Sequence, residues 1–162
     1  MRNEEQIQQA IETYADTVRR ICMLHLKNTS DTEDIFQEVF LKYALSPILF
    51  KNENHEKAWI IRVTINACKD LLKSPWHKRT CGLEACGDLP APQAEEGSVL
   101  SAVNELPAHY RSVIYLYYYE GYSAGEIGTI LGIPRATVHT RLARGREKLR
   151  GILGGADDEQ TV

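Results

Sequence analysis

The side chains with the clearest chemistry lie near the C-terminus, between Pro134 and Gly151. This segment holds six Lys or Arg and one Glu, in a chain of formal net charge −3. If it is projected as a helix at about 100° per residue, small and hydrogen-bonding residues share one side: Ala136, His139, Thr140, Ala143 and Arg144. Such a face can enter a DNA groove and touch base edges. The alternative is a solvated surface helix, but such helices usually mix charges, whereas phosphate contact needs one sign.

A short upstream helix must position that face. Ser123 with Glu126 three residues later forms a capping box, which predicts a helix start. Gly132 is suited to ending this helix, and Pro134 to the first turn of the next. The apolar face of the first helix consists of Ile127, Ile130 and Leu131, and the apolar stripe of the second consists of Val138, Leu142, Gly145 and Leu149. This layout predicts a helix-turn-helix, whose second helix lies in the DNA major groove.

The N-terminal half predicts three helices, over Glu4–Lys27, Thr32–Ala44 and His55–Ser74, with a loop over Leu45–Glu56. The middle helix has a core side formed by Phe36, Val39, Phe40 and Tyr43. Its other side carries Asp34, Gln37, Glu38 and Leu41. Acidic residues near a helix N-terminus often only complement the helix dipole. A docking surface for a basic partner helix is the second interpretation, and spacing alone does not decide between the two.

The third helix has a basic and amide side. Arg62, Asn66, Lys69 and Lys73 fall within one narrow arc, and Lys57 and Trp59 flank it near the N-terminal end. A surface that binds nucleic acid needs positive charge to contact the phosphate backbone and an exposed aromatic ring on which bases can stack. The alternative is a solvated face on a core helix with Trp59 buried, and the sequence favours neither.

The predicted fold is all-α, with two small helical domains at 1–75 and 98–153. Residues 76–97, rich in Gly and Pro, are expected to be a flexible linker, and 154–162 a disordered tail. From Asp88 to Glu105 there are four acidic residues and no basic one, so this tether could lie against a basic patch. The second domain is expected to open with helices over Ser98–Glu105 and Pro107–Glu120, the latter burying Val113, Ile114 and Tyr117.

Composition and cysteine usage narrow the classes of function. No run approaches the ~18 apolar residues of a membrane helix, and the polar, acidic N-terminus is unlike a signal peptide, so a cytoplasmic protein with reduced thiols is expected. Cys22 and Cys68 fit core positions. The set of His77, Cys81 and Cys86 lacks a C-x2-C pair and a fourth ligand, so we expect neither zinc nor a cofactor. The sequence gives equally little support to a Cys81–Cys86 disulfide. No nucleophile–base pair or phosphate-binding glycine loop indicates an enzyme.

Taken together, these stretches resemble the extracytoplasmic-function (ECF) sigma factors of the sigma-70 family, which direct bacterial RNA polymerase to promoters. The runs DTEDIFQEVFLKYA and AWIIRVTINACKDLLK look like sigma region 2, a bundle of three to four helices. The run ELPAHYRSVIYLYYYEGYSAGEIGTILGIPRATVHTRLARGREKLR looks like region 4, a four-helix domain. A helix-turn-helix alone is weak evidence for any one family, but these three runs in this order are strong evidence for a resemblance to this family.

The resemblance implies partners and roles. Asp34, Gln37, Glu38 and Leu41 would grip the clamp coiled coil of the largest subunit of core RNA polymerase, and region 4 would meet the polymerase flap. The Leu45–Glu56 loop and the helix bearing Lys57, Trp59, Arg62, Asn66, Lys69 and Lys73 would meet the promoter −10 element, where a base is flipped out of the non-template strand. His139, Thr140, Ala143 and Arg144 would read the −35 element, with Arg135, Arg141 and Arg146 on phosphates. The linker would thread toward the polymerase active-site channel. The expected regulator is an anti-sigma factor, which could also hold this otherwise cytoplasmic protein at the membrane.

Three positions depart from the family pattern. Gly128 and Gly145 stand where alanine is usual, at a cost of up to ~1 kcal/mol each unless close packing compensates. His139 replaces a more typical basic residue.

The closest alternative function is a free-standing regulator that binds two-fold DNA sites as a dimer without polymerase. A helical adaptor is the more distant alternative.

Overall fold

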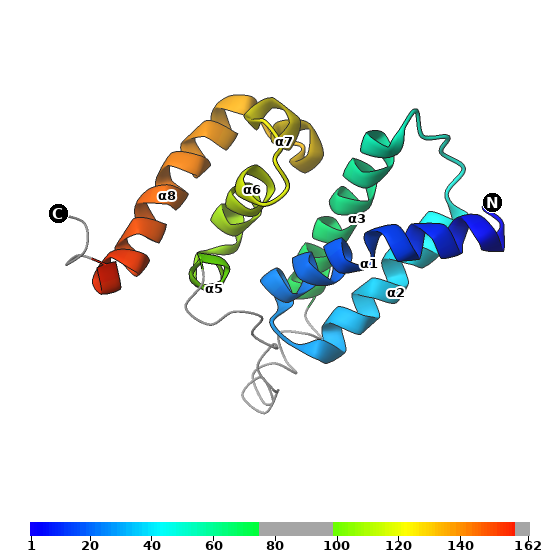
Figure 1. Cartoon of the computed structure of the whole chain (residues 1–162), viewed down its shortest axis with the longest axis horizontal. Helices are drawn as coiled ribbons and strands as arrows, with labels where there is room; N and C mark the ends of the chain where they lie inside the picture. The colour runs from blue at the N-terminus through cyan, green and yellow to red at the C-terminus, as the bar shows by residue number, and fades with distance from the viewer. Residues whose placement is uncertain (75–98, 158–162) are drawn as a thin grey trace. The chain divides into compact units, whose positions relative to one another are not determined.

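The computed structural model describes residues 1–74 and 99–157, and the chain divides into two compact units, Met1–Ala91 and Pro92–Val162. All the regular elements of the described residues are helices, as predicted (Figure 1). The predicted linker, with His77, Cys81 and Cys86, lies outside the described residues. None of the described helices is long and apolar enough to span a membrane.

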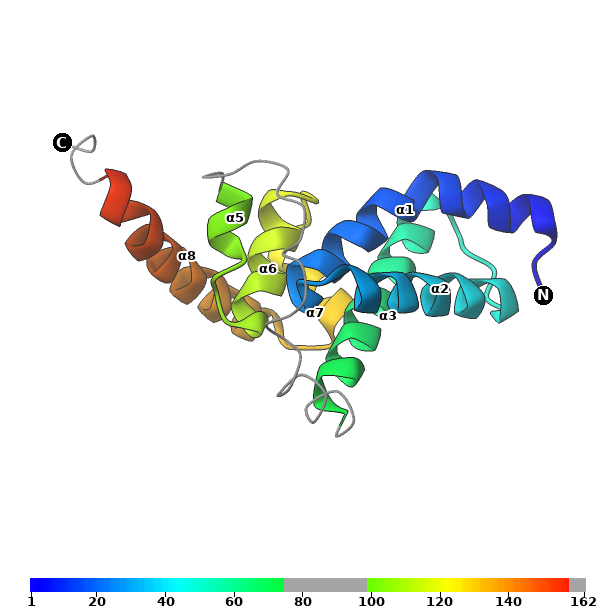
Figure 2. The same cartoon turned by 90° about the horizontal axis from the view of Figure 1, so that it is seen from below.

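The first unit packs three helices against one another: α1 (Glu4–Leu26), α2 (Thr29–Leu45) and α3 (Glu53–Lys73) (Figure 2). Three asparagines cap them, because the side chains of Asn3, Asn28 and Asn52 each accept a hydrogen bond from a backbone N–H in the first turn. The caps at Asn28 and Asn52 start α2 and α3 a few residues before the predicted Thr32 and His55. Between α1 and α2 the chain reverses within two residues, with Lys27 in the left-handed region at φ 63°.

The core of the first unit is apolar and closely packed. It includes the fully buried Val18, Cys22, Val39, Ile60 and Cys68. The predicted core positions of the two cysteines are confirmed. The Cys68 thiol donates a hydrogen bond to the Cys22 sulfur at 4.0 Å, and this bond together with burial raises the pKa of the Cys68 thiol. The Cys68 thiol is therefore protonated and unreactive.

Within residues 99–157 the second unit has four helices, as predicted: α5 (Val99–Val103), α6 (Ala108–Tyr118), α7 (Ala124–Leu131) and α8 (Arg135–Asp157). Helix α6 buries the run Ser112–Leu116 on almost all sides, because α5, α7 and α8 all pack against it. The prediction that Tyr117 is buried is wrong. Tyr117 is 37% exposed, and Tyr115 is buried instead, its hydroxyl donating to Glu120 Oε2 at 2.6 Å.

Helix α8 is longer than predicted. It continues through Gly154 and Gly155 to Asp157, so the first four residues of the predicted disordered tail are helical. Residues 158–162 lie outside the described part of the chain.

Candidate nucleic-acid and polymerase interfaces

The helix-turn-helix forms as the sequence predicts. Ser123 Oγ accepts from the Glu126 N–H, and Glu126 Oε1 accepts from the Ser123 N–H. Gly132 ends α7 in the left-handed region at φ 71°. The Ile133 N–H donates to Gly128 O at 3.0 Å, which closes the turn tightly. Helix α8 begins directly after Pro134, so its direction is fixed by α7 and this turn.

One side of α8 is buried and the opposite side is exposed. Val138, Leu142 and Gly145 are buried against the domain. The residues expected to touch bases are all exposed: Ala136, His139, Thr140, Ala143 and Arg144. Thr140 Oγ1 donates to Ala136 O at 3.1 Å, which leaves its lone pairs available as acceptors. The predicted outward face is therefore present, and none of the described residues of its own domain covers it.

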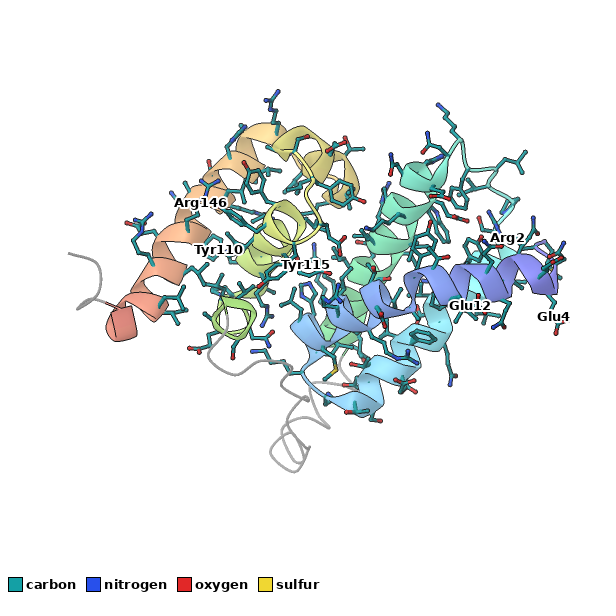
Figure 3. All side chains as sticks on the ribbon, in the orientation of Figure 1. Arg2, Glu4, Glu12, Tyr110, Tyr115 and Arg146 are labelled. Atoms are coloured by element: carbon teal, nitrogen blue, oxygen red, sulfur yellow. The ribbon has the colours of Figure 1, made fainter. Side chains whose placement is uncertain are left out.

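The arginines of α8 differ in placement. Arg135 and Arg144 are exposed and Arg141 is half-buried. Arg146 turns back toward α6, where its Nε donates to the Tyr118 hydroxyl at 2.6 Å (Figure 3). Its guanidinium also lies over the rings of Tyr117 and Tyr118, 5.6 and 5.7 Å from their centroids. This contact holds the Arg146 guanidinium on the α6 side of the helix.

The basic charge of α8 reaches a neighbouring histidine on α6. Partial burial, then the positive charges of Arg141 and Lys148, lower the pKa of His109. His109 is therefore biased toward its neutral form, which adds a hydrogen-bonding ring to this side of the domain without adding charge.

The basic side of α3 faces solvent. Arg62, Asn66 and Lys73 are exposed, whereas Lys57 and Lys69 are half-buried. Trp59 is not the exposed ring that the predicted surface needed. It is half-buried against the core, 5.6 Å from the Phe50 ring and 6.3 Å from the Tyr43 ring between centroids. Burial of the indole's large apolar area explains this placement.

The loop between α2 and α3 spans residues 46–52 and is shorter than the predicted Leu45–Glu56. Leu49 at its tip is 91% exposed. Beside the loop is a hollow of about 570 Å³, lined among others by Tyr43, Phe50 and Glu56. Glu56 accepts hydrogen bonds from the hydroxyls of Tyr14 at 3.0 Å and Tyr43 at 2.5 Å. Burial, then these contacts with Glu56, raises the pKa of both tyrosines.

Helix α2 exposes the side predicted to bind polymerase. Asp34, Gln37 and Glu38 are exposed, and Leu41 is 60% exposed. Leu45, one turn further, is 59% exposed and extends the apolar part of this side. Sequence reasoning missed Leu45 because it was assigned to the loop. Glu38 also pairs with Lys42 at 3.0 Å, an exposed i,i+4 ion pair that contributes at most a few tenths of a kcal/mol.

Among the residues that the structure describes, no cluster of His, Cys, Asp or Glu could hold a metal ion. The set His77, Cys81 and Cys86 lies in the part that is not described.

Comparison with known proteins identifies the family. The model for sigma-70 region 2 matches residues 10–78, and the model for sigma-70 region 4 matches residues 96–149. The ECF RNA polymerase sigma factor SigW of Bacillus subtilis is 32% identical over 158 residues, which cover 86% of this chain and 84% of SigW. The chain belongs to the ECF sigma factors of the sigma-70 family.

A second relative is similar in sequence, and a solved structure is similar in fold. The ECF RNA polymerase sigma factor SigE of Mycolicibacterium smegmatis is 30% identical over 160 residues, covering 92% of this chain and 62% of SigE. A co-crystal structure of the sigma factor RpoE with the anti-sigma factor NepR from Bartonella quintana has a TM-score of 0.67 at 18% identity. It covers 92% of this chain and 97% of that chain, and it shows that the fold is shared.

The two unusual glycines of this sigma factor lie at close approaches. A Cβ on Gly128 would sit 2.8 Å from the backbone oxygen of Ile133, and one on Gly145 would sit 3.0 Å from Ile114 Cγ1. Their lower helix propensity is thus the cost of bringing the turn close to α7 and α6 close to α8.

Proposed function

We propose that this ECF sigma factor divides promoter recognition between its two units. The second unit reads the −35 element as duplex, and the first holds melted −10 DNA while bound to core polymerase. The observation that carries the proposal is the two-sided α8, with a buried stripe and an uncovered face of small and hydrogen-bonding side chains. The protein initiates transcription as a regulatory subunit and has no catalytic residues of its own.

At the −35 element, α8 enters the major groove with His139, Thr140, Ala143 and Arg144 toward the bases. Arg144 is long, exposed and able to contact guanine with two hydrogen bonds. Arg135 and Arg141 contact phosphates beside the groove, which fixes the position of the helix without reading sequence. Because Arg146 is held by Tyr118, it acts mainly by keeping α8 against α6.

At the −10 element, Arg62, Asn66 and Lys73 on α3 bind the backbone of the single strand, with Lys57 and Lys69 adding charge at the margins. The hollow beside the 46–52 loop receives the flipped base. Flipping costs a few kcal/mol per base, which contacts in the hollow must offset. Trp59 contributes by packing behind Phe50 and Tyr43 rather than by stacking on DNA itself.

For polymerase, Asp34, Gln37, Glu38 and Leu41 on α2 bind the clamp coiled coil, and the second unit meets the flap. Acidic side chains next to an exposed leucine form a surface that can bind a basic amphipathic pair of helices. An anti-sigma factor competes for these surfaces, as is supported by the fold shared with a sigma factor crystallised with NepR. The protein works in the cytoplasm, and its anti-sigma factor holds it at the membrane.

Two pairs of variants test the residue assignments in the assembled holoenzyme. Arg144→Ala should cost about 1–3 kcal/mol of discrimination between −35 sequences while leaving polymerase affinity unchanged. Arg135→Ala should weaken binding to all −35 sequences alike, and it should lower the salt dependence of DNA binding by about one ion. An unchanged −35 preference in Arg144→Ala would remove α8 residue 144 from base readout.

The polymerase surface needs its own pair. Glu38→Ala with Gln37→Ala should weaken binding to core polymerase without changing the unfolding midpoint, since both side chains are exposed. Arg19→Gln, on the same unit but outside the proposed surface, serves as the control. If the double variant instead loses a dimer and keeps its polymerase affinity, the free-standing regulator is the better reading.

A further inference from the structure

Arg2 donates four hydrogen bonds to the end of α2 and to the loop between α2 and α3. Its Nη1 donates to Tyr43 O at 2.9 Å and to Ser46 O at 2.5 Å, and its Nη2 donates to Ile48 O at 2.6 Å. The Arg2 backbone N–H donates to Ala44 O at 3.0 Å. A residue that precedes the first helix thus joins the end of α2 to the middle of the loop (Figure 3).

The end of α2 favours a cation at this point. The last carbonyls of a helix have no intrahelical partner and carry the negative end of its dipole. The planar fork of a guanidinium can satisfy several carbonyls at once, which an ammonium group cannot do with the same geometry. The Arg2 side chain therefore stabilises one conformation of a segment that has no helix of its own.

The same side chain contacts the rings that line the hollow. The Arg2 Cζ lies 4.3 Å from the centroid of the Tyr43 ring and 5.0 Å from that of Phe50. These two rings are parallel within 3°, with centroids 6.2 Å apart. Flat rings beside hydrogen-bonding groups suit a nucleic-acid base, which stacks and pairs at its edge. By contacting both rings, one carbonyl at the end of α2 and two carbonyls of the loop, Arg2 links the shape of the hollow to the path of the loop.

We propose that Arg2 is a positioning residue for base capture: it holds Ser46–Phe50 in the conformation that the flipped −10 base meets. This inference rests on the proposed role of the loop at the −10 element. It adds that the N-terminal segment, outside the helix and loop that contact DNA, sets how readily the strand opens and which base is preferred.

The test uses holoenzyme assembled from core polymerase and the full chain. Arg2→Gln removes the charge and the fork, Arg2→Lys keeps the charge alone, and Arg19→Gln is the matched control. Arg19 also lies over a ring, 4.1 Å from the Phe36 centroid, and pairs with Glu33 at 3.4 Å, but it does not contact the loop. The readouts are affinity for core polymerase, opening followed by a fluorescent base in the −10 element, and the preference among promoters permuted at −10.

Arg2→Gln should slow opening about tenfold, the order of effect of losing charge-assisted hydrogen bonds, and flatten the −10 base preference. Arg2→Lys should fall between it and wild type, and core affinity should stay unchanged in all three variants. Backbone amides 46–52 should exchange hydrogen faster in Arg2→Gln. Unchanged opening and preference in Arg2→Gln would overturn the inference, as would a loss explained by weaker core binding.

Leu49→Ser separates this inference from the proposed function. Leu49 is almost fully exposed at the loop tip, so its substitution should not unfold the unit. If Leu49→Ser changes opening and Arg2→Gln does not, the loop captures the base without help from Arg2. If neither variant changes opening or preference, the proposed role of the loop itself fails.

Discussion

Arg146 on α8 donates a 2.6 Å hydrogen bond from Nε to the hydroxyl of Tyr118 on α6. Arg146 is one of six Lys or Arg between Pro134 and Gly151, and its contact with Tyr118 turns it away from the exposed face of α8. The charge of this helix is thus shared between the proposed DNA-binding face and the packing of the domain.

Tyr118→Phe removes that hydrogen bond alone and should lower the free energy of unfolding by about 0.5–1.5 kcal/mol. Arg146→Ala should cost at least as much and leave the preference among −35 sequences intact. Urea unfolding and binding to permuted −35 sequences measure the two effects. If Arg146→Ala lowers the salt dependence of DNA binding by a full ion, as expected for Arg135→Ala, then Arg146 is a phosphate contact after all.

Gly128→Ala should destabilise the second unit by about 1–3 kcal/mol, although alanine favours helices. The added Cβ would lie 2.8 Å from Ile133 O, and backbone at that point cannot easily give way. Gly151→Ala is the control, because nothing lies within 4 Å of its Cβ position and it is exposed within α8. That variant should stabilise by about 0.5–1 kcal/mol. Equal effects of the two substitutions on the unfolding midpoint would contradict the close approach at the turn.

Tyr14 and Tyr43 should make the first unit sensitive to alkali. Burial and the hydrogen bonds to Glu56 raise the pKa of both hydroxyls. The folded state therefore holds these protons at a pH where the unfolded chain has released them. The stability that they provide is fully present below pH ~10, the unfolded value, and is lost as the pH rises further. Tyr14→Phe should flatten this loss in denaturant titrations as the pH rises from about 10 to 12, and an identical slope in wild type and variant would argue against it.

His109 should titrate below its ordinary value, because partial burial, then Arg141 and Lys148, lower its pKa. The unfolded chain thus takes up a proton here before the folded one does, so stability falls as the pH drops below about 6.5. Arg141→Gln should move the midpoint upward in an NMR titration of the imidazole, and Arg135→Gln, whose charge is not among the causes of the shift, should leave it in place.

The helix-turn-helix was predictable almost residue by residue, because its signals are local. The capping box at Ser123 and Glu126, the left-handed Gly132 and the stripe through Val138 and Leu142 each depend on neighbours a few positions away. The outward face of α8 followed from the same periodicity. Its contacts with bases stay predictions.

What could not be predicted depends on contacts distant in sequence. Tyr115 is buried and Tyr117 exposed because α6 lies among three other helices, which widens its buried side beyond a simple stripe. Asn28 caps α2 rather than the later residues of its polar run, since its buried carboxamide also donates to Asp31 Oδ2. The contacts of Arg2 could not be predicted from the sequence, because its partners are backbone carbonyls more than forty residues away.

The two-residue reversal at Lys27 and Asn28 has a consequence for how the first unit assembles. Closing so short a connection costs little chain entropy, so we expect the α1–α2 hairpin to be an early structure in folding. Helix α3 must then join across a longer segment, and the contacts of Arg2 with that segment come last. A growing chain would accordingly present the side of α2 proposed to bind the clamp before the proposed pocket for DNA is complete.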